Sequence, residues 1–350
     1  MGIFGGDCMN KTILKGFIGT YTNTDSRGIY NFKFDCENKV FKTHALAYEI
    51  EKPSYLAVDK ENNILYSVSK DNDLGGVTSF KIKENLSLEK INSVLETENP
   101  PCYINFSNKQ GLIFTANYHH NKINVYPIED GHRIGKPIKT LTHTNNTPHI
   151  HYANLDLDEN FLLTVDLGQD YINLYEIKKN DFIEREDLRV KFSKGCGPRH
   201  LAFHPNGKFI YVLTELSSEI ASFQYNKGYL KLINILSTLP NKYTGVKSGA
   251  AIHIHPNGKF IYTSDRGNNS IACFKIDNAT GSLSLVEHKP TFGSCPRDFA
   301  ISEDGKYILI TNQDSSSLVI FEISEDTGRL INHVGSIEDR KSTRLNSSHY

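Results

Sequence analysis

The residues best able to do chemistry are arginines, histidines and carboxylates at the ends of short apolar segments. Arg199, Arg266 and Arg297 carry planar guanidinium groups, whose geometry suits carboxylate and phosphate. Glu215, placed among such cations, would stay ionised and could act as a base toward water. These residue types predict a site for a small anionic substrate, provided that the fold brings them together.

The elements that would position these residues belong to a unit that recurs six times, about 50 residues apart. The units begin at Pro53, Pro101, Pro148, Pro198, Ala250 and Pro296. Each holds a short opening strand, a β-branched strand such as FIYVLT, an alternating strand such as EIASFQY and a more variable fourth strand. No segment has a convincing helical period. Four antiparallel strands repeated around a circle predict an all-β fold, a β-propeller.

The two ends of the chain complete the count of blades. Residues 14–50 match the second, third and fourth strands of a unit, so six full units and this partial one predict a seven-bladed propeller. The final segment, EDRKSTRLNSSHY, is polar and has no strand-like alternation. We therefore expect an N-terminal extension over 1–11, one propeller over 12–337, and a non-native tail over 338–350 that leaves the inner edge of the first blade open.

Turns on the opposite face are expected from the HPNGK segments that begin at His204 and His255. Asn-Gly favours a type I′ hairpin turn. Because both histidines open such turns, we expect them to hold the turns and pack against neighbouring residues. In a blade, the start of strand one and the end of strand two lie on the same face. That face should carry the polar residues His149, His151, Asp166, Arg199, His200, Glu215, Arg266, Arg297, Asn312 and Gln313.

Several of these residues could have a structural role instead of a functional one. Glu215 could be a structural partner of an arginine, and Arg297 could pair with Asp298. Alternation along a strand should turn one of His149 and His151 toward the channel and the other away. Asp166 could organise its loop instead of binding a ligand.

At these residues the chain resembles the seven-bladed propeller lactonases, a family that includes propeller-type 6-phosphogluconolactonases and fungal carboxy-muconate cycloisomerases. The motifs are PHIHYANLD, GPRHLAFHPNGKFIYVLTELSS, HPNGKFIYTSDRGNNSI and PRDFAISEDGKYILITNQDS, and the resemblance covers roughly Lys15 to Ile337. It implies that the catalytic positions are His149 or His151, Arg199, Glu215 and Arg266. The substrate-binding positions expected beside them are Arg297, His200, Asn312, Gln313 and Asp166.

The reaction implied is hydrolysis of a sugar lactone, 6-phospho-D-glucono-1,5-lactone, to the open acid 6-phosphogluconate. Glu215 or a channel histidine would activate water, and arginine or histidine would stabilise the oxyanion. A lactonizing cycloisomerase would use the same positions. A non-catalytic scaffold that binds protein partners is an alternative from a different class.

The composition of the chain argues against nucleic-acid-binding, membrane-spanning and metal-binding proteins. A net charge of -1 and a pI near 6.9 give no reason to expect nucleic acid or an anionic membrane. The 6 cysteines show no metal-ligand spacing, so we expect reduced thiols, a cytoplasmic protein, and neither metal nor cofactor. No apolar run approaches the roughly 20 residues that span a bilayer.

Overall fold

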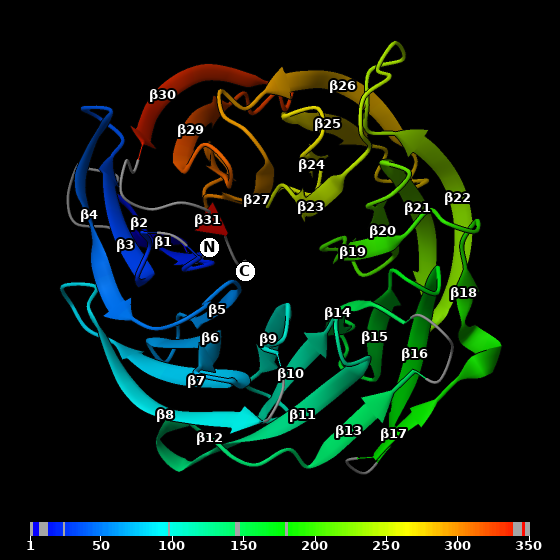
Figure 1. Cartoon of the computed structure of the whole chain (residues 1–350). Helices are drawn as coiled ribbons and strands as arrows, with labels where there is room; N and C mark the ends of the chain where they lie inside the picture. The colour runs from blue at the N-terminus through cyan, green and yellow to red at the C-terminus, as the bar shows by residue number, and fades with distance from the viewer. Residues whose placement is uncertain are drawn as a thin grey trace.

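The computed structural model describes residues 3–6, 13–23, 25–96, 99–143, 148–178, 181–338 and 345–346. Its strands form seven separate sheets arranged in a ring around a central channel (Figure 1). In four of the seven sheets the order follows the chain order, in the other three an extra short strand pairs off this path, and every pairing between neighbouring strands is antiparallel. The predicted seven-bladed propeller is therefore confirmed. Within the described ranges, no helix is long and apolar enough to cross a membrane.

The inner strands of six blades line the channel. They are β5 (Leu56–Asp59), β9 (Tyr103–Ser107), β14 (Ile150–Leu155), β19 (Pro198–Phe203), β23 (Gly249–Ile254) and β27 (Pro296–Ile301). The second strands are β2 (Ile13–Thr20), β6 (Ile64–Asp71), β10 (Leu112–Asn117), β15 (Phe161–Asp166), β20 (Phe209–Thr214), β24 (Phe260–Asp265) and β28 (Tyr307–Asn312). These second strands are buried on both faces, which explains their continuous apolar character.

The third and fourth strands complete each blade outward. The third strands are β3 (Gly28–Asp35), β7 (Leu74–Ile82), β11 (Lys122–Glu129), β16 (Tyr171–Lys178), β21 (Glu219–Asn226), β25 (Ser270–Ile276) and β29 (Ser317–Ile323). The outer strands are β4 (Val40–Glu49), β8 (Leu88–Glu96), β12 (Arg133–Ile134), β13 (Lys139–Thr142), β17 (Asp181–Glu184), β18 (Val190–Lys191), β22 (Tyr229–Ser237), β26 (Leu283–Pro290) and β30 (Leu330–Glu338). Within the described ranges, two short 3₁₀ helices, η1 (Asp130–His132) and η2 (Glu186–Leu188), interrupt outer edges.

Among the described residues, the first blade has no full inner strand, and two short segments pair with β2 (Ile13–Thr20) in its place. β1 (Ile3–Gly6) pairs with the start of β2, and β31 (Leu345–Asn346) pairs with Gly19 and Thr20 at its end. Both segments come from stretches that the sequence analysis placed outside the propeller. The backbone of β2 supplies the reason, because an unpaired inner edge offers N–H and C=O groups to any extended chain within reach.

The HPNGK turns differ from the type I′ turns that were expected. The N–H of Gly207 donates to the carbonyl of His204, so Pro205 and Asn206 are the central residues. Proline fixes φ near −65°, which excludes a type I′ turn, and only Gly207 has a positive φ, at 71°. The ring of His204 contacts the Gly258 carbonyl of the next blade at 2.8 Å, in keeping with its expected packing role.

Candidate active site

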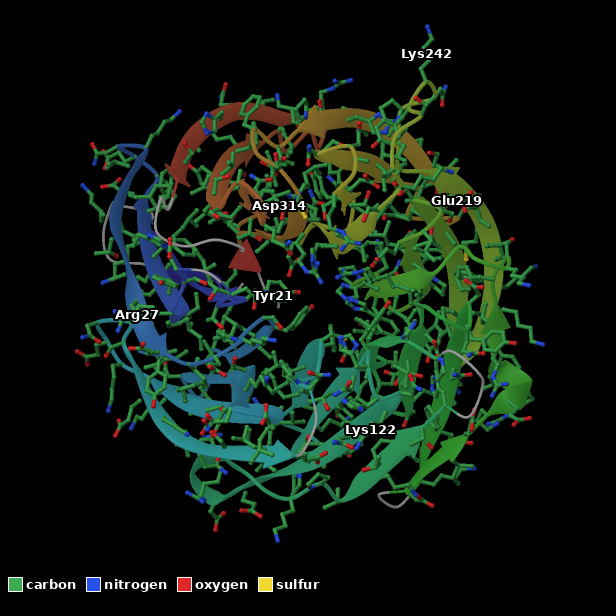
Figure 2. All side chains as sticks on the ribbon, viewed as in Figure 1. Tyr21, Arg27, Lys122, Glu219, Lys242 and Asp314 are labelled. Atoms are coloured by element: carbon green, nitrogen blue, oxygen red, sulfur yellow. The ribbon has the colours of Figure 1, made fainter. Side chains whose placement is uncertain are left out.

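Described residues line two cavities in the channel, one toward each face of the ring. The first has a volume of about 420 Å³ and lies where strand-one starts meet strand-two ends. Its lining includes Tyr21, Lys52, Ser54, Cys102, Tyr118, His119, His151, Glu215, Arg266 and Arg297. Figure 2 shows Tyr21 near the centre of the ring, where side-chain nitrogen and oxygen atoms gather. We refer to this space as the polar cavity.

Two repeat positions supply most of the polar cavity. One lies at the start of strand one, directly before Tyr55, Tyr103, Tyr152 and Asp298, and gives Ser54, Cys102, His151 and Arg297. The other is the residue directly after strand two, which gives Tyr21, Tyr118, Glu215 and Arg266. Residues far apart in the chain thus meet because the blades place equivalent positions on one ring.

β-bulges aim the strand-one residues. The register of pairing shifts between Ile150 and Tyr152 and again between Pro198 and His200. In a bulge, two residues of one strand lie opposite a single residue of the partner strand, and this changes the direction of their side chains. As a result His151 and Tyr152, which follow one another, both face the channel, His151 toward the polar cavity and Tyr152 toward the other one.

Glu215 lies between two arginines from neighbouring blades. The Nε of Arg199 is 2.9 Å from its Oε2, and the Nη2 of Arg266 is 2.8 Å from its Oε1. Arg199 is almost fully buried, and its Nη1 also donates to the carbonyl of Ala250. Each carboxylate oxygen therefore has one cation, and the carboxylate cannot rotate without breaking an ion pair.

The electrostatics of this group keep Glu215 charged. Burial alone would raise its pKa, but Arg199, Arg266 and Arg297 together outweigh burial and hold the pKa below its usual value. Burial lowers the pKa of Arg199 to about 10, an effect that Glu215 opposes. At neutral pH the centre is thus a carboxylate between two cations.

Arg297 is the third arginine of the polar cavity, and it is not engaged with a carboxylate. Its guanidinium lies over the ring of Tyr21, with the Cζ atom 5.1 Å from the ring centroid. Among the described residues, Arg297 makes no hydrogen bond or ion pair, and its buried Nε has no partner. Among the described residues, Arg297 does not form the ion pair with Asp298 that was considered as its alternative role. Asp298 instead lies 3.4 Å from His253.

The structure separates the two histidines of the PHIH segment. His151 is buried at 5 % exposure and lines the polar cavity. His149 stacks on Tyr118, with centroids 4.2 Å apart and ring planes 6° apart, and its backbone N–H donates to Asp166. His149 thus supports the cavity wall through Tyr118, and the bulge, not simple alternation, decides which histidine faces the polar cavity.

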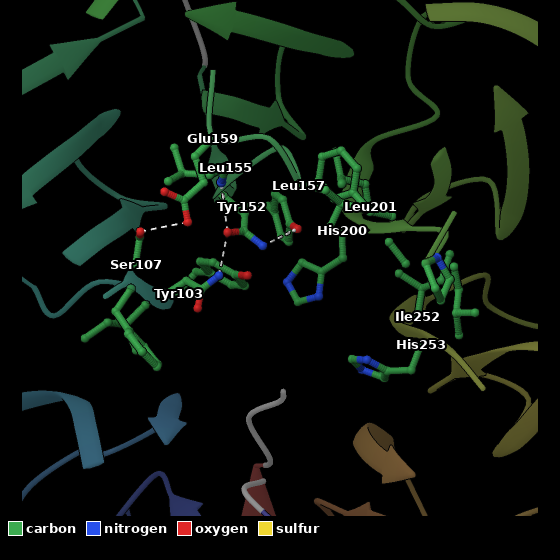
Figure 3. A pocket seen from close by; sticks show the side chains of 18 of the residues that line it. Tyr103, Ser107, Tyr152, Leu155, Leu157, Glu159, His200, Leu201, Ile252 and His253 are labelled. Carbon is green, nitrogen blue, oxygen red and sulfur yellow. Dashed lines mark hydrogen bonds between the residues drawn. The ribbon is translucent and has the colours of Figure 1, made fainter. Parts of the chain in front are cut away.

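His200 lies deeper in the channel. Its Nε2 is 3.1 Å from Nδ1 of His151, and it lines the second cavity, of about 810 Å³, together with Tyr55, Tyr103 and Tyr152. Figure 3 shows His200 and His253 pointing into this cavity. The hydrogen bond between His151 and His200 therefore joins the layers that line the two cavities.

Besides His200, three of the predicted binding residues lie outside the polar cavity. Asp166 is fully buried and accepts hydrogen bonds from the backbone of His149, Gly168 and Gln169, so it organises its turn. Asn312 is fully buried and donates to Thr291 and Ser317. Gln313 donates to Asp314. Polar residues at strand ends commonly hold turns in this way, and these three do so.

The catalytic and substrate-binding positions expected from the sequence did not include Tyr21, Lys52, Cys102 and Tyr118, although all four line the polar cavity. Three of them occupy the same two repeat positions as Arg297 and Glu215, so the repeat itself carried the signal. Cys102 is not a nucleophile at neutral pH, because burial raises the pKa of its thiol to about 11. The described residues contain no cluster of three or more His, Cys, Asp or Glu side chains suited to a metal ion.

A ring of seven antiparallel blades, with a carboxylate held between two arginines at one mouth of the channel, defines the class as a seven-bladed β-propeller. The sequence matches the family described as lactonase, 7-bladed beta-propeller, over residues 15–345. The chain belongs to this lactonase family.

Individual relatives agree with this assignment. The chain is 37% identical over 294 residues to a protein of Bacillus subtilis named 6-phosphogluconolactonase, covering 81% of this chain and 84% of the relative. A solved structure of a periplasmic gluconolactonase of Pseudomonas aeruginosa superposes with a TM-score of 0.88 at 26% identity, over 95% of this chain and 98% of the other. A Lactobacillus plantarum protein of known structure is 30% identical, with a TM-score of 0.88, over 95% of this chain and 98% of its own.

Proposed function

We propose that this protein hydrolyses a sugar lactone, 6-phospho-D-glucono-1,5-lactone, to 6-phosphogluconate. The observation that carries the proposal is the carboxylate of Glu215 fixed between Arg199 and Arg266, in a cavity with a further uncommitted arginine. Family membership and the name of the Bacillus relative support the same reaction.

The reaction begins with water held against Glu215. The water oxygen attacks the lactone carbonyl carbon as its proton passes to the Glu215 carboxylate, and negative charge develops on the carbonyl oxygen. Arg266 and His151, which line the same cavity, are placed to stabilise that oxyanion. The tetrahedral intermediate then collapses, the bond from the carbonyl carbon to the ring oxygen breaks, and the ring oxygen takes up the proton as a hydroxyl.

The two ion pairs affect what Glu215 contributes. Because Arg199, Arg266 and Arg297 keep its pKa low, Glu215 is a weak base but is always ionised at neutral pH. It therefore holds and orients the water as well as accepting its proton, and the positive charge around it favours the oxyanion. General base catalysis of this kind contributes about 100- to 10,000-fold.

The charge of the polar cavity favours an anionic substrate. Glu215 balances one positive charge, whereas Arg199, Arg266, Arg297 and Lys52 all lie in or beside the cavity. Arg297, stacked on Tyr21, presents donors that suit a phosphate. A phosphorylated sugar lactone satisfies both parts of the site, the carbonyl at Glu215 and the phosphate at Arg297. A phosphorylated substrate is charged and is retained in the compartment that produces it. We therefore place the enzyme in the cytoplasm.

A muconate-type cycloisomerase remains the second candidate, because Arg297 would bind a carboxylate as readily as a phosphate. A panel of lactones separates the two. Purified protein is given 6-phosphoglucono-1,5-lactone, glucono-1,5-lactone and a muconolactone, and acid release is followed above the spontaneous rate. The proposal expects the highest kcat/KM for the phosphorylated lactone. Turnover of the muconolactone alone would favour the cycloisomerase, and no turnover by folded protein would favour a scaffold.

A further inference from the structure

We propose that His200 fixes the tautomer of His151, so that His151 presents its Nε2–H to the polar cavity and donates a hydrogen bond to the substrate. The role in catalysis rests on the proposed function, whereas the tautomer does not. His200 is then a positioning residue that acts through His151.

The two rings form a direct contact between neighbouring blades. His151 comes from β14 and His200 from β19, and Nδ1 of His151 lies 3.1 Å from Nε2 of His200. Their centroids are 4.9 Å apart and their planes 65° apart, an edge-on arrangement that points one nitrogen at the other. Both side chains are buried, at 5% and 4% exposure. One ring must donate the shared proton and the other must accept it.

Arg199 decides the direction of this hydrogen bond. Its Nη1 lies 3.5 Å from Nδ1 of His200, and a guanidinium has only donors. A proton on Nδ1 of His200 would point at the cation, so Nδ1 carries the lone pair. Arg199 cannot turn away, because its Nε pairs with Glu215 and its Nη1 donates to Ala250.

A neutral His200 with a bare Nδ1 holds its proton on Nε2. Burial, followed by the charge of Arg199 and the neighbouring His151, keeps the pKa of His200 well below its usual value, with Asp298 opposing the shift. The Nε2–H of His200 therefore donates to Nδ1 of His151. His151 is neutral too, because burial and the charges of Arg199, Arg297 and Arg266 lower its pKa well below the usual value.

With Nδ1 occupied as an acceptor, His151 carries its proton on Nε2. A neutral imidazole of this kind is a hydrogen-bond donor toward a carbonyl oxygen and cannot accept a proton there. This divides the roles in the polar cavity, with Glu215 receiving the proton of water and His151 stabilising the oxyanion.

Three tyrosines hold His200 in the required orientation. Its ring centroid lies 6.2 Å from that of Tyr55, 5.6 Å from Tyr103 and 5.8 Å from Tyr152. Two of these contacts are edge-to-face, and the tyrosines also pack against each other at 4.7 Å. Rotation of the His200 ring would break this packing, so the relay from Arg199 to His151 is fixed by shape as well as charge.

Nitrogen NMR tests the tautomer without any substrate. Protein labelled with ¹⁵N-histidine is recorded at neutral pH by long-range ¹H–¹⁵N correlation, and His151→Gln assigns the His151 signals. We expect the Nε2–H pattern for both His151 and His200. An Nδ1–H or doubly protonated pattern at His151 would overturn the proposal, whatever the activity.

Variants of His200 test the link to catalysis. His200→Leu removes the donor, so the His151 signals should change and kcat should fall about 10- to 100-fold with KM little altered. His200→Gln keeps an N–H donor near the position of Nε2, and should retain the wild-type His151 pattern and most of the activity. His288→Leu, on the outer strand β26, is the matched control and should change neither.

The possible outcomes separate this inference from the proposed function. Unchanged His151 signals and kcat in His200→Leu would overturn the inference while leaving lactone hydrolysis intact. Absence of lactonase activity in wild-type protein would remove the proposed function while leaving the NMR result valid. If His200→Leu does not fold, the wild-type spectrum and His200→Gln still decide.

Discussion

The Nη2 of Arg266 lies 2.8 Å from Oε1 of Glu215, although the two residues follow the second strands of neighbouring blades. Gly267, directly after Arg266, permits this placement, because a Cβ atom there would lie 1.8 Å from the carbonyl oxygen of Val246. The loop before β23 can therefore close against the Arg266 backbone. The centre of the site depends on contact between blades, so its geometry is a property of the whole ring.

Replacing Glu215 with Gln should lower kcat about 100- to 10,000-fold, because the amide cannot accept the proton of water. Part of the counter-charge between Arg199 and Arg266 is lost as well, so we expect the free energy of unfolding to fall by about 1–3 kcal/mol. Steady-state kinetics and denaturant unfolding measure the two effects. Glu219→Gln, at the start of β21, should leave kcat unchanged, and an active Glu215→Gln would remove Glu215 from the mechanism.

Arg297→Met should weaken binding of the phosphorylated substrate more than it slows the chemical step. Arg297 has no carboxylate partner among the described residues, so its loss should raise KM at least tenfold for 6-phosphogluconolactone and change it little for gluconolactone. Arg329→Met is the control, because that guanidinium is 53% exposed and pairs with Glu287. An equal loss for both lactones would place Arg297 at the carbonyl and not at the phosphate.

The product 6-phosphogluconate should stabilise the fold through the polar cavity. A ligand that binds only the native state adds about 2.7 kcal/mol at 100 times its Kd, a shift of several degrees in Tm. Arg297→Met should abolish most of this shift. A scaffold would show no shift with 6-phosphogluconate, and that outcome would count against the enzyme.

The stability of the protein should fall as pH drops below about 6.5, the ordinary pKa of histidine. Burial, with Arg199 as the next cause, places the folded-state pKa values of His151 and His200 well below it. The unfolded chain therefore binds more protons from pH 6.5 down to those folded-state values, and each ring costs up to about 1.4 kcal/mol per pH unit. Above pH 6.5 neither ring contributes.

Denaturant unfolding between pH 5 and 7.5 checks this prediction. The His151→Gln/His200→Gln double variant should show a smaller slope of stability against pH, because neither position can then take up a proton. An identical slope in the wild type and the double variant would contradict the neutral state of the two rings.

The repeat allowed the fold and the ring of candidate residues to be predicted, because its period fixes which positions share a face. Glu215, Arg266 and Arg297 were placed together from this argument alone, and they line one cavity. The choice between His149 and His151 was left open. It depends on a bulge at the start of β14, which shifts register without leaving a mark in the residue types.

Other features could not be predicted because the same residue types serve two purposes. Asp166 and Asn312 have the polarity of binding residues, yet their side-chain atoms bond turns and neighbouring loops. The pairing of Leu345 with Thr20 depends on the unpaired edge of β2, not on any pattern in the tail. Pro205 did carry the information about its turn, since its fixed φ excludes the type I′ geometry expected from Asn-Gly.

The most direct test is the hydrolysis of freshly prepared 6-phosphoglucono-1,5-lactone, corrected for spontaneous opening, by the wild type and by Arg266→Ala. We predict clear turnover in the wild type and a loss of about 100- to 1,000-fold in Arg266→Ala, since one stabiliser of the oxyanion is removed. Folded wild-type protein that does not exceed the spontaneous rate would contradict the proposed function. Equal rates for the two proteins would contradict the proposed site.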